Sequence, residues 1–112
     1  MSNRIQRVNA LIKNEVGKIL LREVDFPQSV LATITRVETS ANLFEAKVYV
    51  SVMPEEQVDR IFQILNKRVY DIQQALNKRL KMRPIPRIEF RKEEKTKEAG
   101  RIEELLEGLK KR

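Results

Sequence analysis

The sequence predicts a single α+β domain in which helices cover one three-stranded sheet. Two long segments carry apolar residues at spacings of three and four, which is typical of amphipathic helices. Three shorter segments alternate apolar and polar side chains or are rich in β-branched residues, which is typical of strands. The 112 residues are enough for one domain, which we expect to span residues 1–112, and the 41% of apolar residues can fill one core.

The first helix is expected from Asn3 to Val24, because its apolar residues fall on one face. These residues are Ile5, Val8, Ile12, Val16, Ile19 and Leu20. Gly17 costs about 1 kcal/mol relative to alanine inside a helix, and its missing side chain leaves room for a close neighbour. Residues 25–27 (Asp-Phe-Pro) should end the helix, since the residue before a proline disfavours the helical conformation.

Two strands are expected next, from Val30 to Thr39 and from Leu43 to Val52. The second strand alternates clearly, and one of its faces carries Ala46, Val48, Val50 and Val52. Its other face carries Lys47, Tyr49 and Ser51. The turn at residues 40–42 is short, so the two strands should pair antiparallel, with one face of the sheet packed on helices.

A long helix is expected from Glu55 to Met82, after Pro54, which suits the start of a helix. Its apolar stripe stays in phase and consists of Val58, Ile61, Phe62, Leu65, Val69, Ile72, Leu76 and Leu80. As a straight rod this helix would measure about 42 Å, whereas a domain of this size is roughly 34 Å across. The helix should therefore bend or extend beyond the domain.

The third strand is expected from Ile85 to Arg91, with Ile88 and Phe90 facing the core. Residues 92–100 are charged and poor in apolar side chains, as loops are. A short helix is expected from Arg101 to Lys111, and its apolar residues are Ile102, Leu105, Leu106 and Leu109. A helix this short is unstable alone in water, so it should either dock on the domain or fray.

The excess positive charge is concentrated in residues 67–92, which we call the basic segment. It holds nine basic residues and two acidic ones, a net charge of +7, which equals the net charge of the whole chain. A concentrated positive field is typical of a protein that binds a polyanion such as RNA. The alternative is an ordinary solvated helix face, although such faces usually mix charges of both signs.

The absence of histidine and cysteine argues against an enzyme. The sequence lacks the commonest general base and metal ligand, and it can form neither disulfides nor thiolate metal sites. We expect no catalysis, no cofactor and no metal, and we expect the carboxylates of Glu93, Glu94 and Glu98 to be solvated.

The sequence also bears on where the protein resides. No apolar run approaches the roughly 18 residues of a membrane span, and the start lacks the apolar block of a secretory signal. We therefore expect a cytoplasmic protein. The basic, amphipathic residues 1–14 would also suit an organelle transit peptide, so a bacterial and a plastid origin both stay open.

Several segments resemble the ribosome-binding factor A family, and the resemblance covers nearly the whole chain. The most specific match joins residues 34–40 (Ile-Thr-Arg-Val-Glu-Thr-Ser) to residues 46–52 (Ala-Lys-Val-Tyr-Val-Ser-Val). Leu43, between these two runs, belongs to the same match. Weaker matches are Arg7-Val8, Arg83, Pro86, Phe90, Gly100-Arg101-Ile102 and Leu105-Leu106. The resemblance implies a KH-like fold of the second type and a bacterial assembly factor that binds the small ribosomal subunit near its RNA. It also implies help in late maturation of that RNA and its 5′ end, notably during cold adaptation, without catalysis.

The chain departs from related patterns at three places. KH domains usually clamp the nucleic-acid backbone with a Gly-X-X-Gly loop, and this sequence has none. The family has an Ala-X-Gly kink instead, and the matching residues here are Arg68-Val69-Tyr70, so the bend should be shallower or differently made. After the first helix the family has Asp-Pro-Arg, whereas residues 25–28 here are Asp-Phe-Pro-Gln, without an arginine that could contact RNA.

The basic segment supplies the residues that we expect to contact RNA phosphates. They are Lys67, Arg68, Lys78, Arg79, Lys81, Arg83, Arg87 and Arg91. Each could instead be a solvated charge, and Arg83 could pair with Glu89 or hold a carbonyl. Tyr49 and Tyr70 could stack on bases, although Tyr49 is better explained as a half-buried strand residue. Phe44, Phe62 and Phe90 are expected in the core.

Two other classes of function stay open at this point. A protein-interaction or homodimerisation module would seat a partner helix on the stripe from Val58 to Leu80, whereas we expect a monomer away from the ribosome. A small RNA-processing nuclease is the third hypothesis, and the absence of histidine and cysteine argues against it.

Overall fold

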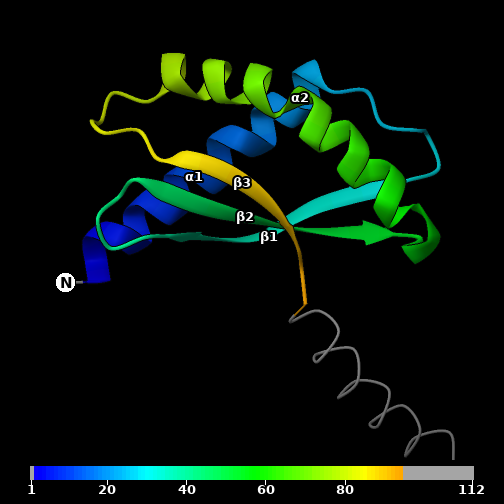
Figure 1. The fold of residues 1–112 in the computed structure, drawn as a ribbon, viewed down its shortest axis with the longest axis horizontal. Helices are drawn as coiled ribbons and strands as arrows, with labels where there is room; N and C mark the ends of the chain where they lie inside the picture. The colour runs from blue at the N-terminus through cyan, green and yellow to red at the C-terminus, as the bar shows by residue number, and fades with distance from the viewer. Residues whose placement is uncertain (1, 95–112) are drawn as a thin grey trace, which may run out of the picture.

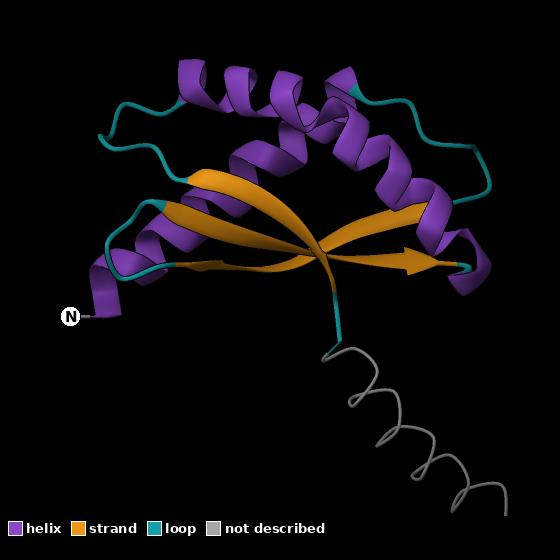
Figure 2. Cartoon of the chain, in the orientation of Figure 1, coloured by secondary structure: helices purple, strands orange, loops and turns teal. Residues whose placement is uncertain are grey.

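The computed structural model describes residues 2–94 and confirms the predicted order of elements over this range. The elements are α1 (Ser2–Glu23), β1 (Leu31–Thr39), β2 (Glu45–Met53), the 3-10 helix η1 (Glu55–Gln57), α2 (Val58–Arg79) and β3 (Arg87–Lys92) (Figure 1, Figure 2). Neither α1 nor α2 is long and apolar enough to cross a membrane. The helix predicted from Arg101 to Lys111 lies outside the described residues.

The three strands form one mixed sheet in the order β1-β2-β3. β1 and β2 pair antiparallel, as their short turn predicts, whereas β2 and β3 pair parallel. A bulge interrupts the pairing of β1 with β2 between Ile34 and Arg36. Residues three apart in a regular strand point to opposite faces of the sheet. The bulge shifts this alternation, so Ile34 and Val37 both pack in the core.

Both helices contribute to a single core on one face of the sheet. The alternation predicted for β2 is confirmed, because Ala46, Val48, Val50 and Val52 are all buried while Lys47 is exposed. The same cluster includes Ile12, Val16 and Ile19 of α1 and Ile61, Leu65, Ile72 and Leu76 of α2. Each such side chain stabilises the fold by about 1.5–3 kcal/mol. The stripe of α2 is therefore buried within its own domain, which argues against its use as a dimer interface.

The long helix predicted from Glu55 to Met82 is shorter than expected, and it bends. It opens as η1, continues as α2 and ends at Arg79, because Leu80 is extended, with φ of −94° and ψ of 139°. Leu80 turns into the core there and is buried. The two halves of α2 run in different directions in Figure 1, so the helix follows the domain instead of extending beyond it. The bend needs no glycine, since residues 58–79 are helical throughout.

The turn before β2 also differs from the prediction, because the strand begins at Glu45 and not at Leu43. Leu43 has a left-handed backbone, with φ of 66°, and its side chain is buried. Its amide donates to the carbonyl of Ser40 across 2.9 Å and closes the turn. Phe44 therefore lies outside the core and is 60% exposed, so its predicted burial is wrong, whereas Phe62 and Phe90 pack in the core as predicted.

Candidate nucleic-acid interface

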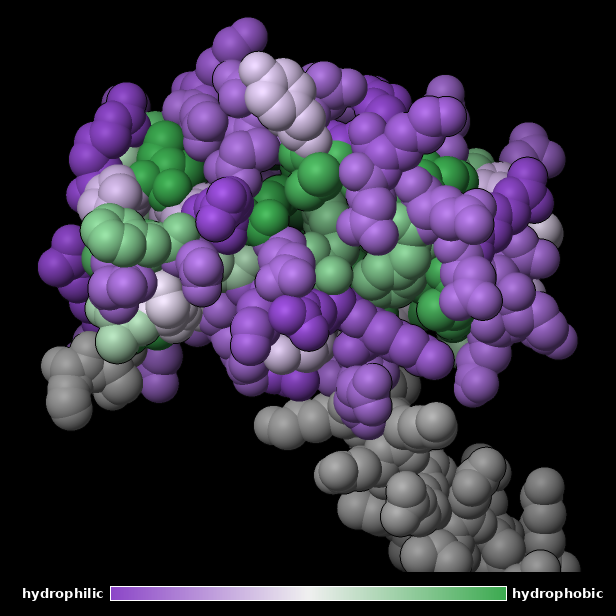
Figure 3. All heavy atoms as spheres, in the orientation of Figure 1, coloured by the Kyte–Doolittle hydropathy of each residue, from purple (hydrophilic) through white to green (hydrophobic). Residues whose placement is uncertain are grey.

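α2 carries half of the predicted RNA-contacting residues, two on the side away from its buried stripe and two beside the stripe. Lys67 and Lys78 are exposed there, whereas Arg68 and Arg79 flank the stripe and are half-buried. Hydrophilic side chains accordingly gather over α2 along the top of Figure 3. Lys78 and Arg79 occupy the last turn of α2, where positive charge is favourable beside the negative end of the helix dipole.

Three of the predicted residues meet at one surface depression between α2 and the end of α1. Its volume is about 620 Å³, and we call it the α2 depression. Its lining residues are Glu23, Arg68, Asp71, Gln74, Ala75, Lys78 and Arg79. Three cations face two carboxylates, so the wall is positive overall and suits a phosphate group approaching from solvent.

Three of the eight predicted residues form ion pairs within the domain. Arg68 Nε lies 3.3 Å from Asp71 Oδ2, and Arg91 Nη2 lies 3.2 Å from Glu89. Both pairs are exposed, and such pairs contribute only about 0–1 kcal/mol, so a phosphate can replace the carboxylate at little cost. Arg79 Nη1 lies 3.2 Å from Glu15 Oε1, whose side chain is mostly buried, so Arg79 also ties α2 to α1.

The other five residues are exposed and form no ion pair within residues 2–94. They are Lys67, Lys78, Lys81, Arg83 and Arg87. Arg83 Nη1 donates to the carbonyl of Met82 across 2.8 Å, so it holds a carbonyl and does not pair with Glu89. These five side chains therefore present their charge to solvent.

Gln73 positions the end of the basic segment, and sequence reasoning did not identify it. Its Nε2 donates to the carbonyl of Pro86 across 3.2 Å, and its Oε1 accepts from the amide of Ile88 across 2.9 Å. These two bonds join the middle of α2 to the start of β3 and close the loop that carries Lys81 and Arg83. Gln73 lies four residues after Val69 and three before Leu76, which places it at the border of the apolar stripe. A polar residue at such a position was the signal that could have identified it.

Tyr49 lies on the sheet face opposite the helices and is half-buried, as predicted. The guanidinium of Arg36 lies 3.7 Å from the centre of its ring, and its hydroxyl donates to Glu38 across 3.3 Å. Arg36 therefore covers one face of the ring and excludes base stacking there. Tyr70, on α2, is 70% exposed and keeps its ring open to solvent.

Glu93 was expected to be solvated, and the structure shows that this is wrong. Its side chain is buried beside β1, where Thr35 Oγ1 donates to Glu93 Oε1. Arg36 Nε and Nη2 donate to the two carboxylate oxygens across 3.0 and 3.3 Å. The hydrogen bond to Glu93 raises the pKa of Arg36 above its usual range. The carboxylate thus has a structural role at the end of β3.

The acidic residues after β3 do not form a metal site in the described chain. Glu94 is exposed, and Glu98 lies outside residues 2–94. Over that range no group of three or more carboxylate, histidine or cysteine side chains could hold a metal ion.

The chain matches the family model for ribosome-binding factor A over residues 4–106. It is 37% identical over 108 residues to the ribosome-binding factor A of Thermodesulfovibrio yellowstonii, covering 96% of this chain and 92% of that protein. It is 35% identical over 107 residues to the ribosome-binding factor A of Bdellovibrio bacteriovorus, covering 95% of this chain and 80% of that protein.

Solved structures with the same name share the fold. The crystal structure of ribosome-binding factor A from Thermus thermophilus is similar with a TM-score of 0.68 and 25% identity, covering 79% of this chain and 94% of that one. A homology model of the Thermus thermophilus ribosome-binding factor A, fitted into the cryo-EM map of its 30S complex, is similar with a TM-score of 0.60 and 27% identity. The match covers 74% of this chain and 88% of that one.

Proposed function

Because the chain belongs to the ribosome-binding factor A family, we propose that it is a non-catalytic assembly factor that binds the free small ribosomal subunit. A relative with the same fold has been fitted into the map of a 30S complex, which supports this choice of partner. Ribosomal RNA is the component that we expect it to contact, because exposed positive charge favours a phosphate backbone.

The observation that carries this proposal is the set of five exposed cations in the basic segment that form no ion pair within residues 2–94. Lys67 and Lys78 project from α2, Lys81 and Arg83 from the following loop, and Arg87 from the start of β3. We propose that these residues contact phosphates directly and that Arg68, Arg79 and Arg91 join them by exchanging carboxylate partners for phosphates. Lysine and arginine contacts of this kind fix the position of RNA without reading its sequence.

We propose that binding assists late maturation of the small-subunit RNA, including processing of its 5′ end, and that this help matters most in the cold. A bound protein stabilises the RNA conformation that it fits, and an incorrect RNA structure is harder to escape at low temperature. The chain would act in the cytoplasm, as a monomer away from the ribosome, and as one domain with residues 101–111 appended.

The absence of histidine and cysteine supports a role without catalysis. Any effect on RNA ends would then come from the conformation of the RNA and the access that it gives to other enzymes. Incubation of the isolated protein with precursor RNA and magnesium ions should therefore leave the RNA intact, and cleavage would replace this proposal with a nuclease.

The experiment that tests the proposal is sedimentation with separated small subunits, large subunits and joined ribosomes in sucrose gradients at low and moderate salt. We expect co-migration with free small subunits, and we expect it to weaken as salt rises because phosphate contacts release counterions. Equal binding to every RNA-containing fraction would reduce the protein to a general RNA binder. No co-migration at either salt would refute the proposal.

A charge-reversal pair localises the interface. Lys78→Glu with Lys81→Glu should abolish co-migration, because two exposed phosphate contacts become repulsive. Arg4→Glu with Lys13→Glu makes the same change of charge at two exposed sites of α1, outside the basic segment, and should leave binding in place. If both double variants lose co-migration equally, binding depends on the net charge of the protein and not on the basic segment.

A further inference from the structure

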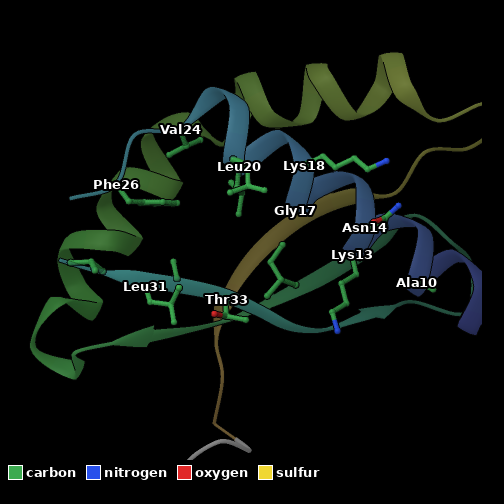
Figure 4. A pocket seen from close by; sticks show the side chains of 14 residues that line it. Ala10, Lys13, Asn14, Gly17, Lys18, Leu20, Val24, Phe26, Leu31 and Thr33 are labelled. Carbon is green, nitrogen blue, oxygen red and sulfur yellow. The ribbon is translucent and has the colours of Figure 1, made fainter. Parts of the chain in front are cut away.

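An apolar groove runs between α1 and β1, outside the basic segment, with a volume of about 690 Å³. β1 is the edge strand on this side of the sheet, and α1 lies along it (Figure 4). The groove is lined by Leu20 and Leu21 of α1, by Leu31 and Ile34 of β1, and by Val24 and Phe26 between them. Leu21 and Leu31 are 88% and 64% exposed. Two large apolar side chains open to solvent in one groove indicate a surface that another chain segment covers.

Gly17 keeps the middle of this groove open. It lines the groove from α1, and a Cβ atom built on it would meet no other atom within 4 Å. The space above it is therefore not used by the described part of the domain. A side chain from another segment can approach the backbone of α1 closely at this position.

The end of β3 leaves the following part of the chain within reach of the edge strand β1, which lines the groove. Glu93 bonds Thr35 and Arg36 of β1, and Thr35 directly follows Ile34, which lines the groove. The last described residues therefore lie within reach of β1 but on the sheet face opposite the helices, so the following chain must pass the edge of β1 to reach the groove (Figure 1). Residues 95–100, fully extended, reach about 20 Å, which is enough to pass around the edge of β1.

We propose that the groove binds residues 101–109 of the same chain. This segment repeats apolar residues at helical spacing, namely Ile102, Leu105, Leu106 and Leu109. As a helix it would be about 13 Å long, and α1 lines the groove from Ala10 to Leu21, a length of about 18 Å. Such a helix gains its stability only from burying its apolar stripe, and the groove offers a matching apolar surface.

The charges around the groove complement those of the segment. Lys13 and Lys18 lie on the α1 side of the groove, and Lys18 also pairs with Glu15 at 3.8 Å. The segment carries Glu103, Glu104 and Glu107. Ion pairs at exposed sites contribute little to affinity, so these charges set the orientation of the segment and the apolar stripe holds it in place.

The tether favours this occupant over a second copy of the chain. A short flexible linker holds its segment at an effective concentration on the order of 1 mM, which exceeds the concentrations at which a small protein is usually handled. The proposal concerns the free protein and does not depend on binding to the ribosome.

Paramagnetic labelling of the full chain tests this inference. The chain has no cysteine, so Glu104→Cys provides a single site for a nitroxide on the side of the predicted helix away from its apolar stripe. In the docked state the label should broaden the amide signals of Gly17, Ala32 and Thr33 by at least about fivefold more than that of Tyr70, because the tether keeps the label at the groove and broadening falls steeply with distance from the label. Broadening of all amides alike would overturn the proposal.

Two further samples keep the test specific. Leu105→Asp with Leu106→Asp should abolish the selective broadening, whereas Thr96→Asp with Ala99→Asp adds the same charge outside the stripe and should preserve it. A labelled chain mixed with an unlabelled, 15N-enriched chain should cause no groove broadening. Broadening in that mixture would show that a second copy occupies the groove, which would overturn the intramolecular assignment.

Discussion

Arg36 of β1 and Glu93, the first residue after β3, form a two-pronged ion pair, with Nε–Oε1 and Nη2–Oε2 distances of 3.0 and 3.3 Å. The two strands are not neighbours, since β2 lies between them. Arg36 rests on the ring of Tyr49 in β2, so the pair joins all three strands on the face opposite the helices. It fixes the place where β3 ends and the C-terminal segment begins.

Replacement of Glu93 by alanine should lower the free energy of unfolding by about 2 kcal/mol, because it removes hydrogen bonds to a charged group and leaves Thr35 and Arg36 without this partner. Urea denaturation followed by circular dichroism measures the change. Glu94→Ala removes the same charge one residue later at an exposed site and should change the unfolding free energy by less than about 0.5 kcal/mol. Equal effects would contradict a structural role for Glu93.

Replacement of Gln73 by leucine should destabilise the domain by about 1–3 kcal/mol, because the amide of Ile88 and the carbonyl of Pro86 lose their partner. The amide of Ile88 should also exchange with solvent faster in NMR hydrogen-exchange measurements. The neighbouring Gln74 is exposed, so Gln74→Leu serves as the control and should leave both quantities nearly unchanged. Unchanged exchange at Ile88 in Gln73→Leu would contradict the bond.

In the Leu105→Asp, Leu106→Asp background, in which the groove should be empty, replacement of Gly17 by alanine should raise the free energy of unfolding by about 0.5–1 kcal/mol, because glycine is a poor helix former and the added Cβ meets no other atom of residues 2–94. The backbone of Gly17 has no positive φ that a side chain would strain. Thermal unfolding should show a higher midpoint. A lower midpoint would mean that something outside residues 2–94 occupies the space above Gly17.

Replacement of Asp71 by asparagine should strengthen binding to the small subunit by roughly two- to fivefold, since it frees Arg68 from an exposed ion pair and removes a negative charge from the α2 depression. Filter binding or fluorescence anisotropy at fixed salt gives the affinity. Asp59→Asn, at an exposed site on the first turn of α2, is the matched control and should leave affinity unchanged. A weaker complex for Asp71→Asn would place RNA away from the depression.

Replacement of Lys81 by alanine should weaken RNA binding and reduce the slope of log affinity against log salt by about 0.7, the value expected for one lost contact to single-stranded RNA. A salt titration of the wild-type and variant proteins measures both slopes. Lys13→Ala removes an exposed lysine from α1 and should leave the slope as it is. If Lys81→Ala also keeps the wild-type slope, Lys81 is a solvated charge.

The parts of the fold that follow from local patterns could be predicted from the sequence. The stripe of α1 and the alternation of β2 each depend on neighbouring residues, and both appear in the structure close to the expected limits. The start of β2 could not be predicted, because a buried leucine with a left-handed backbone at position 43 goes against its own conformational preference. The place of Phe44 was missed for the same reason.

The candidate site shows the same division. The exposure of Lys67 and Lys78 was predictable from helical periodicity, because both positions lie away from the apolar stripe of α2. The partners of Arg79 and Glu93 were not, because Glu15 and Arg36 lie far away in sequence and meet them only in the folded domain. The hydrogen bonds of Gln73 to β3 depend on the parallel pairing of β2 with β3, which no local pattern indicates.

The parallel pairing of β2 with β3 has a consequence for how the chain folds as it is synthesised. β1 and β2 are joined by a short turn and can pair as soon as both have left the ribosome, whereas β3 comes only after η1, α2 and the loop. Until then one edge of β2 has no strand beside it, and the buried side of Val48 and Val50 has only part of its cover. A nascent chain of this protein should thus be most prone to aggregation just before residue 92 emerges.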